Sequence, residues 1–275
     1  MQQRQKANRN RLLAATRPFM QRRILIIDDH DDLATALEEV LSAMGHSVAL
    51  LKSRADALEV TNFEQFDLVI TDLDIHSHRS PNLNGDSDSD EHVKAFKVSA
   101  ANFTRSEFEE SELKEVVATV LDYKTRHIDK RDSVQDLHEH IEFEVPSAIS
   151  LMHIVLEYLM KRVEKLGVVK AEQSNLFVAL DEAFVNAVKH GNKFDTKKLV
   201  RIIAEVSKQE ARFTIEDEGE GFDVNSIPDP LDPSNLFKTS GRGVLFIYNI
   251  MDEVKYNERG NRLTMIKRCD PEPAT

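Results

Sequence analysis

The first part of the chain repeats a pattern of apolar runs and helical spacings. Residues 23–29 form a continuous apolar run that ends in acids, which is typical of a buried parallel strand whose carboxyl end meets solvent. Apolar residues at helical spacing follow and end at Gly45, and then come a second strand, a second helix and a third strand over residues 66–74. Strand–helix–strand–helix–strand with short connections predicts a parallel α/β sheet.

Three acids and a polar segment interrupt this regular pattern. Asp28, Asp29 and Asp72 fall at the carboxyl ends of predicted strands, where ligands gather in parallel α/β sheets. Residues 75–92 are polar and rich in Ser, Asn and Asp, so we expect a loop there. A long helical pattern follows, and residues 128–140 are charged and weakly periodic, which predicts a linker.

A different order of elements begins at residue 141. Residues 141–147 predict an edge strand that opens a new domain, and a helical stretch and a second helix follow it. A hairpin of alternating strands, a loop rich in Pro, Asp and Gly, a helix from about Val244 and a closing hairpin complete the order. The predicted organisation is a basic tail (1–22), a first domain (23–127, shortened around 75–92), a linker (128–140), a second domain (141–269) and a tail (270–275).

Composition narrows the classes of function. The chain has 275 residues and a net charge of −12, with 48 acidic against 36 basic side chains, which argues against bulk binding to nucleic acid or to anionic lipid. No apolar run approaches the roughly 20 residues that span a bilayer, so no membrane segment is expected. One cysteine, Cys269, excludes an intrachain disulfide and fits a reducing, cytoplasmic compartment.

The second predicted helix of the C-terminal part carries a polar row. Glu182, Asn186 and His190 recur every four residues and therefore line one face, while the apolar residues around them lie mainly on other faces. An amide oxygen suits Mg²⁺, and a carboxylate can accept a proton from a hydroxyl nucleophile. Taken alone, the row also fits an amphipathic helix with a solvated polar face.

Two glycine-containing segments further along the chain favour a ligand-binding role for this row over a merely solvated polar face. Asp217 ends a predicted strand and is followed by Gly219 and Gly221, and glycine lets a backbone approach a ligand closely. An Asp beside such a turn can accept a hydrogen bond from an exocyclic amine. Gly241 and Gly243 precede a helix start, where free backbone N–H groups and the helix dipole favour phosphate.

The three segments in this order resemble the GHKL, or Bergerat-fold, ATPases, and most closely the anti-sigma-factor serine kinases of bacterial partner switching. Residues 182–190, EAFVNAVKH, match the E-x-x-x-N-A-x-x-H box of those kinases. The resemblance covers roughly residues 141–269 and implies an α/β two-layer sandwich that binds ATP and Mg²⁺. It gives His190 a structural rather than a catalytic role, and makes residues 223–240 a lid. The other implied roles are Glu182 as catalytic base, Asn186 as Mg²⁺ ligand, Asp217 for the adenine amine, Gly219 and Gly221 against the base, Gly241, Arg242 and Gly243 near the phosphates, and Thr264 as an aid to adenine binding.

The resemblance also implies a reaction and partners. A serine or threonine of a small STAS-type anti-anti-sigma protein would be phosphorylated, and a sigma factor is a further partner. The alternatives are a non-catalytic ATP-binding module that sequesters a sigma factor or STAS protein, and a histidine kinase. The last is disfavoured because a strand pattern directly follows His138 and His140 and leaves little room for a helical hairpin. A homodimer is expected from the resemblance alone.

Residues 23–127 resemble a response-regulator receiver domain with a flavodoxin-like parallel sheet. The resemblance makes Asp28 and Asp29 Mg²⁺ ligands, makes Asp72 the phosphoacceptor for an upstream histidine kinase, and assigns residues 93–103 to the receiver's fourth helix and fifth strand.

The sequence departs from the receiver pattern in two places. Arg105 or Ser106 stands where the family has a Lys, and no strand ending in Thr or Ser is visible between the third strand and residue 93. These departures leave open a pseudo-receiver that regulates by protein contact.

Overall fold

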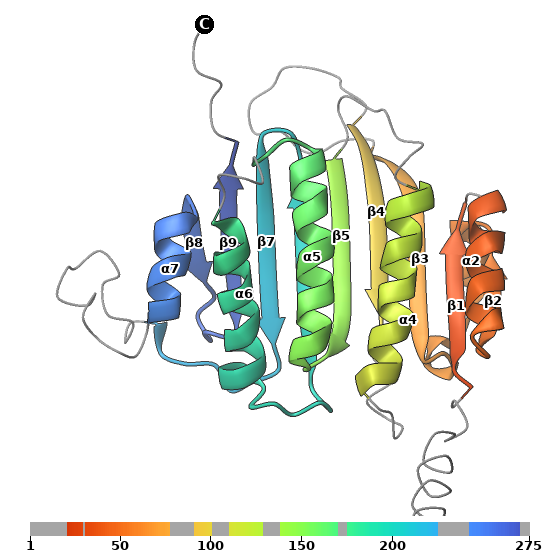
Figure 1. Cartoon of the computed structure of the whole chain (residues 1–275), viewed down its shortest axis with the longest axis horizontal. Coiled ribbons are helices and arrows are strands. Elements are labelled where there is room, and N and C mark those ends of the chain that lie inside the picture. The colour runs from red at the N-terminus through yellow and green to blue at the C-terminus, as the bar shows by residue number, and fades with distance from the viewer. Residues whose placement is uncertain are drawn as a thin grey trace, which may run out of the picture.

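The computed structural model describes residues 21–29, 31–77, 91–100, 110–128, 138–169, 175–224 and 242–269. Within these residues nine strands form one sheet in the order β2-β1-β3-β4-β5-β6-β7-β9-β8 (Figure 1). The strands are β1 (Arg23–Asp28), β2 (Ser47–Leu51), β3 (Leu68–Ser77), β4 (Glu91–Ser99), β5 (His138–Pro146), β6 (Leu199–Val206), β7 (Glu210–Asp217), β8 (Glu253–Tyr256) and β9 (Arg262–Arg268). The helices are α2 (Asp31–Ala43), α3 (Arg54–Glu59), α4 (Glu110–Tyr123), α5 (Ile149–Lys165), α6 (Leu176–Asn186) and α7 (Arg242–Ile250).

Five helices lie side by side over one face of the sheet, in the order α2, α4, α5, α6, α7 (Figure 1). Alternate residues of the strands point toward these helices and form the main core with them, because successive side chains of a strand face opposite sides. The short helix α3 covers the other face at β1–β3, over a small cluster around Leu25, Ile27 and Phe66. No helix among the described residues has the length and apolar character needed to cross a membrane.

The first three strands confirm the predicted flavodoxin-like part. β1 pairs in parallel with β2 and β3, which gives the 2-1-3 order with which such sheets begin. The prediction for residues 93–103 was wrong. Residues 93–99 belong to the single strand β4, which runs antiparallel to β3. The period-two burial of Lys94, Phe96 and Val98 explains the strand, since it aims these side chains at the helices. The ends of the expected loop over 75–92 are strand, because β3 extends to Ser77 and β4 begins at Glu91, and residues 78–90 lie outside the described part.

β5 lies in the middle of the sheet and not at an edge, which corrects the prediction for residues 141–147. It pairs in parallel with β4 and antiparallel with β6. The two predicted domains therefore share one hydrogen-bonded sheet. β5–β9 with α5–α7 form the predicted two-layer sandwich. Of the predicted linker, residues 138–140 lie in β5 and residues 129–137 lie outside the described part, so the division into domains stays a prediction.

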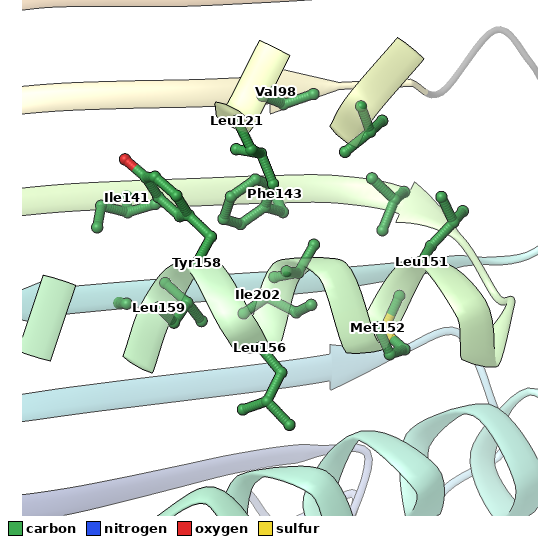
Figure 2. Packing of buried hydrophobic residues seen from close by; sticks show 14 of the residues in the cluster. Val98, Leu121, Ile141, Phe143, Leu151, Met152, Leu156, Tyr158, Leu159 and Ile202 are labelled. Carbon is green, nitrogen blue, oxygen red and sulfur yellow. The ribbon is translucent and has the colours of Figure 1, made fainter. Parts of the chain in front are cut away.

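Aromatic packing fills the core where the two halves meet. The ring centroids of Phe96 on β4 and Phe143 on β5 lie 6.1 Å apart in an edge-to-face arrangement. Tyr158 of α5 lies 5.8 Å from the first ring and 6.0 Å from the second. Figure 2 shows Phe143 and Tyr158 with Leu121 of α4. Such pairs stabilise beyond the area that they bury, so this cluster joins β4, β5 and α5.

Candidate functional site

A pocket of about 340 Å³ opens between α6, α7, the end of β7 and the turn between β8 and β9. Ile215, Val244 and Leu263 give it apolar walls. Its polar groups come from the end of α6 and the residues after it, from the end of β7 and the turn that follows, and from β8, β9 and the turn between them. A pocket of this volume with few polar groups is typical of small-molecule sites. Its lining residues are Ala183, Asn186, Ala187, His190, Gly191, Lys193, Ile215, Asp217, Glu220, Gly221, Phe222, Val244, Tyr256, Gly260, Asn261, Arg262 and Leu263.

Asp217 is the half-buried acid of this pocket. Burial raises the pKa of its carboxyl above the ordinary value of 3.8, and the Gly219 N–H and the charges of Lys198 and Arg259 oppose that rise. The Gly219 N–H donates to Oδ1 of Asp217 over 2.8 Å. When ionised, the carboxylate can accept a hydrogen bond from an amine of a ligand.

Two glycines allow the Asp217 carboxylate to sit where it does. A Cβ at Gly191, at the end of the wide helical turn after α6, would overlap the carboxyl group of Asp217. A Cβ at Gly219 would overlap the carbonyl oxygen of Gly191 and would lie 2.6 Å from Oδ1 of Asp217. The helix end and the turn after β7 therefore meet at a distance that only glycine permits. Gly219 is thus packed against Gly191 and Asp217, and its predicted contact with the adenine base stays a prediction.

The polar row of α6 divides between two places. Asn186 lines the pocket, whereas Glu182 lies one turn earlier, against the start of α7. A Cβ at Gly243 would overlap the Glu182 carboxylate, so a side chain at this position would push the acid aside. Arg242 begins α7, and Gly241 lies outside the described residues. The structure thus brings Glu182 and Asn186 together beside the N-terminus of a helix, where anions are favoured.

The structure changes the predicted role of Thr264. Thr264 lies on the opposite face of the sheet from its pocket-lining neighbour Leu263, and its Oγ1 is 3.2 Å from Oγ1 of Thr214. The prediction that Thr264 aids adenine binding was therefore wrong, because strand alternation turns it away from the pocket. His190 is exposed and lines the pocket, and its structural rather than catalytic role stays a prediction.

Two asparagines at the site were missed by sequence reasoning. Asn192 is fully buried behind the turn after β7, and Asn261 lines the pocket beside Asp217. Both bond to the main chain around Asp217. Their hydrogen bonds join residues far apart in sequence, so no local pattern marks them. The only sequence signals are the position of Asn192 directly after the polar row and that of Asn261 after a glycine turn.

A second group of charged residues lies in the N-terminal half. Asp28 and Asp72 are register neighbours on β1 and β3, and both are buried. Lys124, in the wide helical turn after α4, places its Nζ 2.7 Å from Oδ2 of Asp72. Among the described residues Oδ1 of Asp72 has no hydrogen-bond partner, whereas Asp29 is exposed.

The cation that contacts Asp72 is Lys124, which the sequence pattern did not single out. Arg105 and Ser106, the residues at the expected place of the receiver's Lys, lie outside the described residues. Across the described part of the chain, no three His, Cys, Asp or Glu side chains lie close enough together to hold a metal ion. The structure thus gives Asp72 a buried cation as its partner, and Asp28 and Asp29 as Mg²⁺ ligands stay a prediction.

Comparisons with known proteins match a known domain in each half of the chain. The model of the histidine kinase-like ATPase domain matches residues 145–267, and that of the response regulator receiver domain matches residues 24–80, ending just after β3. The serine-protein kinase RsbW of Staphylococcus epidermidis is 27% identical over 142 residues, which cover 49% of this chain and 89% of that protein. The RsbW of Staphylococcus aureus (strain Newman) is 25% identical over the same length. The chain therefore joins a response regulator receiver domain to a GHKL-type histidine kinase-like ATPase domain, and its C-terminal half is homologous to the RsbW kinases.

Proposed function

We propose that the chain is an ATP-dependent serine/threonine protein kinase of the partner-switching type, controlled by its receiver-like half. The observation that carries this proposal is the convergence of Asp217, Asn186 and Glu182 at one pocket and its rim. Homology to proteins named serine-protein kinase supports the same reaction class. STAS-type anti-anti-sigma proteins and sigma factors are the proposed partners.

Each residue has a separate task in the proposed reaction. The Asp217 carboxylate accepts a hydrogen bond from the adenine amine, and the apolar walls of Ile215 and Leu263 cover the base. Asn186 offers an amide oxygen to Mg²⁺, and the N-terminus of α7 stabilises the phosphates. ATP supplies the phosphoryl group and Mg²⁺ neutralises its charge. Glu182 accepts the proton of the protein hydroxyl that attacks.

The fit of a nucleotide rests on the shape and chemistry of the pocket. Its volume of about 340 Å³ falls within the range of small-molecule sites. Gly191 and Gly219 leave Asp217 open toward the pocket, since side chains there would overlap its carboxylate. Gly243 leaves the same kind of space for Glu182 at the rim. The three glycines therefore keep both carboxylates in place beside a free volume.

Transfer from labelled ATP to purified STAS proteins tests the proposal. The Glu182→Ala variant should bind ATP as the wild type does and lose phosphate transfer, because binding alone needs no base. The Asp217→Asn variant should bind ATP weakly. Glu157→Ala is the matched control, since Glu157 is an exposed acid on α5 away from the pocket. Transfer by Glu182→Ala at the wild-type rate would exclude Glu182 as the base, whereas ATP binding by the wild type without any transfer would favour a binding module.

The role of Asp72 as phosphoacceptor is part of the proposal and needs its own test. Treatment with a small phosphodonor and mass spectrometry of the peptide that contains Asp72 would detect an aspartyl phosphate. Since the carboxylate is buried and its Oδ2 is held by Lys124, phosphorylation requires this pair to open or Lys124 to stay with the new phosphate. A peptide without modification, under conditions that phosphorylate a receiver control, would leave the pseudo-receiver interpretation.

A further inference from the structure

Asn192 holds the main chain at Asp217 from the helix side. Its Oδ1 accepts the Glu218 N–H over 2.9 Å, and its Nδ2 donates to the Leu199 carbonyl over 2.8 Å. The side chain is 0% exposed, so neither bond competes with water. Lys193 and Phe194, which follow, have φ values of 56° and 60°. Two successive non-glycine residues in the left-handed region are strained, and such strain persists where surrounding bonds fix the chain.

Asn261 holds the same main chain from the opposite side. The Asp217 N–H donates to the Asn261 carbonyl over 3.0 Å, and Nδ2 of Asn261 donates to the Asp217 carbonyl over 2.8 Å. Asn257 supports this amide, because its Nδ2 donates to Oδ1 of Asn261 over 3.0 Å and its Oδ1 accepts the Asn261 N–H over 3.1 Å. Asn261 is 7% exposed and is bonded through both its main chain and its side chain.

Together the two asparagines fix the peptide groups on both sides of the Asp217 side chain. The carboxylate has little freedom left, since Oδ1 accepts the Gly219 N–H and the group packs against Gly191. We propose that Asn192 and Asn261 are positioning residues that aim Asp217 and thereby set the nucleobase selectivity of the site. The inference rests on the proposed ATP-binding function and adds to it the two residues that make Asp217 selective for a base with an amine at position 6.

The chemistry of an ionised carboxylate explains the selectivity. It can only accept hydrogen bonds, so it pairs with the 6-amino group of adenine. Hypoxanthine, the base of ITP, has a carbonyl oxygen at that position, which would face the carboxylate as a second acceptor. A site built to receive a hydrogen bond discriminates strongly against an analogue that lacks the donor, because its buried polar group is left unpaired. The discrimination depends on the direction of the carboxylate, which the asparagines set.

Dissociation constants for ATP and ITP, measured by calorimetry on the full chain, test the proposal. We expect the wild type to prefer ATP. Asn261→Ala should weaken ATP binding about tenfold, the effect of losing one well-placed hydrogen bond, and leave ITP binding within about twofold. Thr264→Ala is the matched control, since Thr264 directly follows the pocket-lining Leu263 on β9 but faces away from the pocket. This control should keep the wild-type ratio of the two constants.

The ratio of the dissociation constants for ITP and ATP distinguishes a positioning role of Asn261 from a merely structural one. Weaker binding of both nucleotides by the same factor in Asn261→Ala would overturn the proposal, because general loosening does not depend on the amine. A wild type that binds both equally would also overturn it, although nucleotide binding would stand. A wild type that binds neither would refute the proposed function itself. If the melting temperature shows that Asn261→Ala does not fold, Asn257→Ala replaces it. A smaller loss of the preference for ATP over ITP in this variant would support the proposal. Equal weakening of the binding of both nucleotides would overturn it.

Discussion

Replacing Lys124 by Met removes the cation that neutralises Asp72 inside the protein. The two side chains are 4% and 3% exposed, and their charged atoms lie 2.7 Å apart. Breaking a buried pair by removing one partner costs about 3–5 kcal/mol, since it leaves a buried charge uncompensated. Nζ of Lys124 also lies 4.3 Å from the centroid of the Phe96 ring, a desolvated cation–π contact that contributes about 2 kcal/mol. Because whole domains are stable by only about 5–15 kcal/mol, Lys124→Met should lose a large fraction of the free energy of unfolding.

Urea denaturation followed by circular dichroism measures this loss. The double variant Asp72→Leu with Lys124→Met should recover most of it, because an apolar pair of similar volume needs no desolvation. The control is Lys97→Met, whose Nζ lies 2.9 Å from Oε1 of Glu142 on the open face of the sheet, with side chains 39% and 18% exposed. Exposed pairs contribute about 0–1 kcal/mol. A loss in Lys124→Met no larger than in this control would refute the reasoning.

Three further predictions address the pocket and the shared sheet. Gly243→Ala should lower the rate of phosphate transfer more than tenfold, which corresponds to about 1.4 kcal/mol in the activation barrier, with little change in ATP affinity. The reason is that the added Cβ would displace the Glu182 carboxylate at the rim. Equal transfer rates for variant and wild type would contradict this prediction. Burial raises the pKa of Asp217, so the stability that this group contributes is present at low pH and is lost as pH rises through its folded-state pKa. Over this increase in pH the free energy of unfolding of Asp217→Asn should therefore rise relative to that of the wild type. A difference between the two proteins that does not depend on pH would contradict the prediction. Phe143→Ala should cost about 3–5 kcal/mol and lower one thermal transition of the whole chain, and two transitions with only one shifted would show that the halves unfold separately.

Local patterns predicted those parts of the fold that depend on local spacing. The elements from β1 to β3 and the helix α6 follow from apolar runs and helical periods, and Asp217 followed from its place between a strand and a glycine turn. The position of Thr264 was also available from the sequence, since alternation with the apolar Leu263 and Met265 places it on the other face.

Long-range pairing could not be predicted in the same way. The pattern of β4 permits a strand, but only contact with β3 and β5 decides its direction and makes β5 a central strand. Lys124 contacts Asp72 from a helix end far along the chain, and no spacing of residues in the sequence predicts that contact. These features depend on how the halves dock, which is a property of the three-dimensional fold rather than of any one segment.

The helix α4 shows why the N-terminal half is best treated as part of one unit. Arg22 beside β1 bonds Glu112 of α4 through two nitrogens, each at 3.0 Å, and Lys124 bonds Asp72 at the other end of the helix. On the other side, α4 packs against α5, where Ser150 donates to Glu110, and α5 packs against α6, which carries Glu182. Sheet and helix layer therefore run from the receiver-like acids to the pocket without a break. A charge change at Asp72 acts on a helix that packs against both halves, so we expect its effect on stability to extend beyond the N-terminal half.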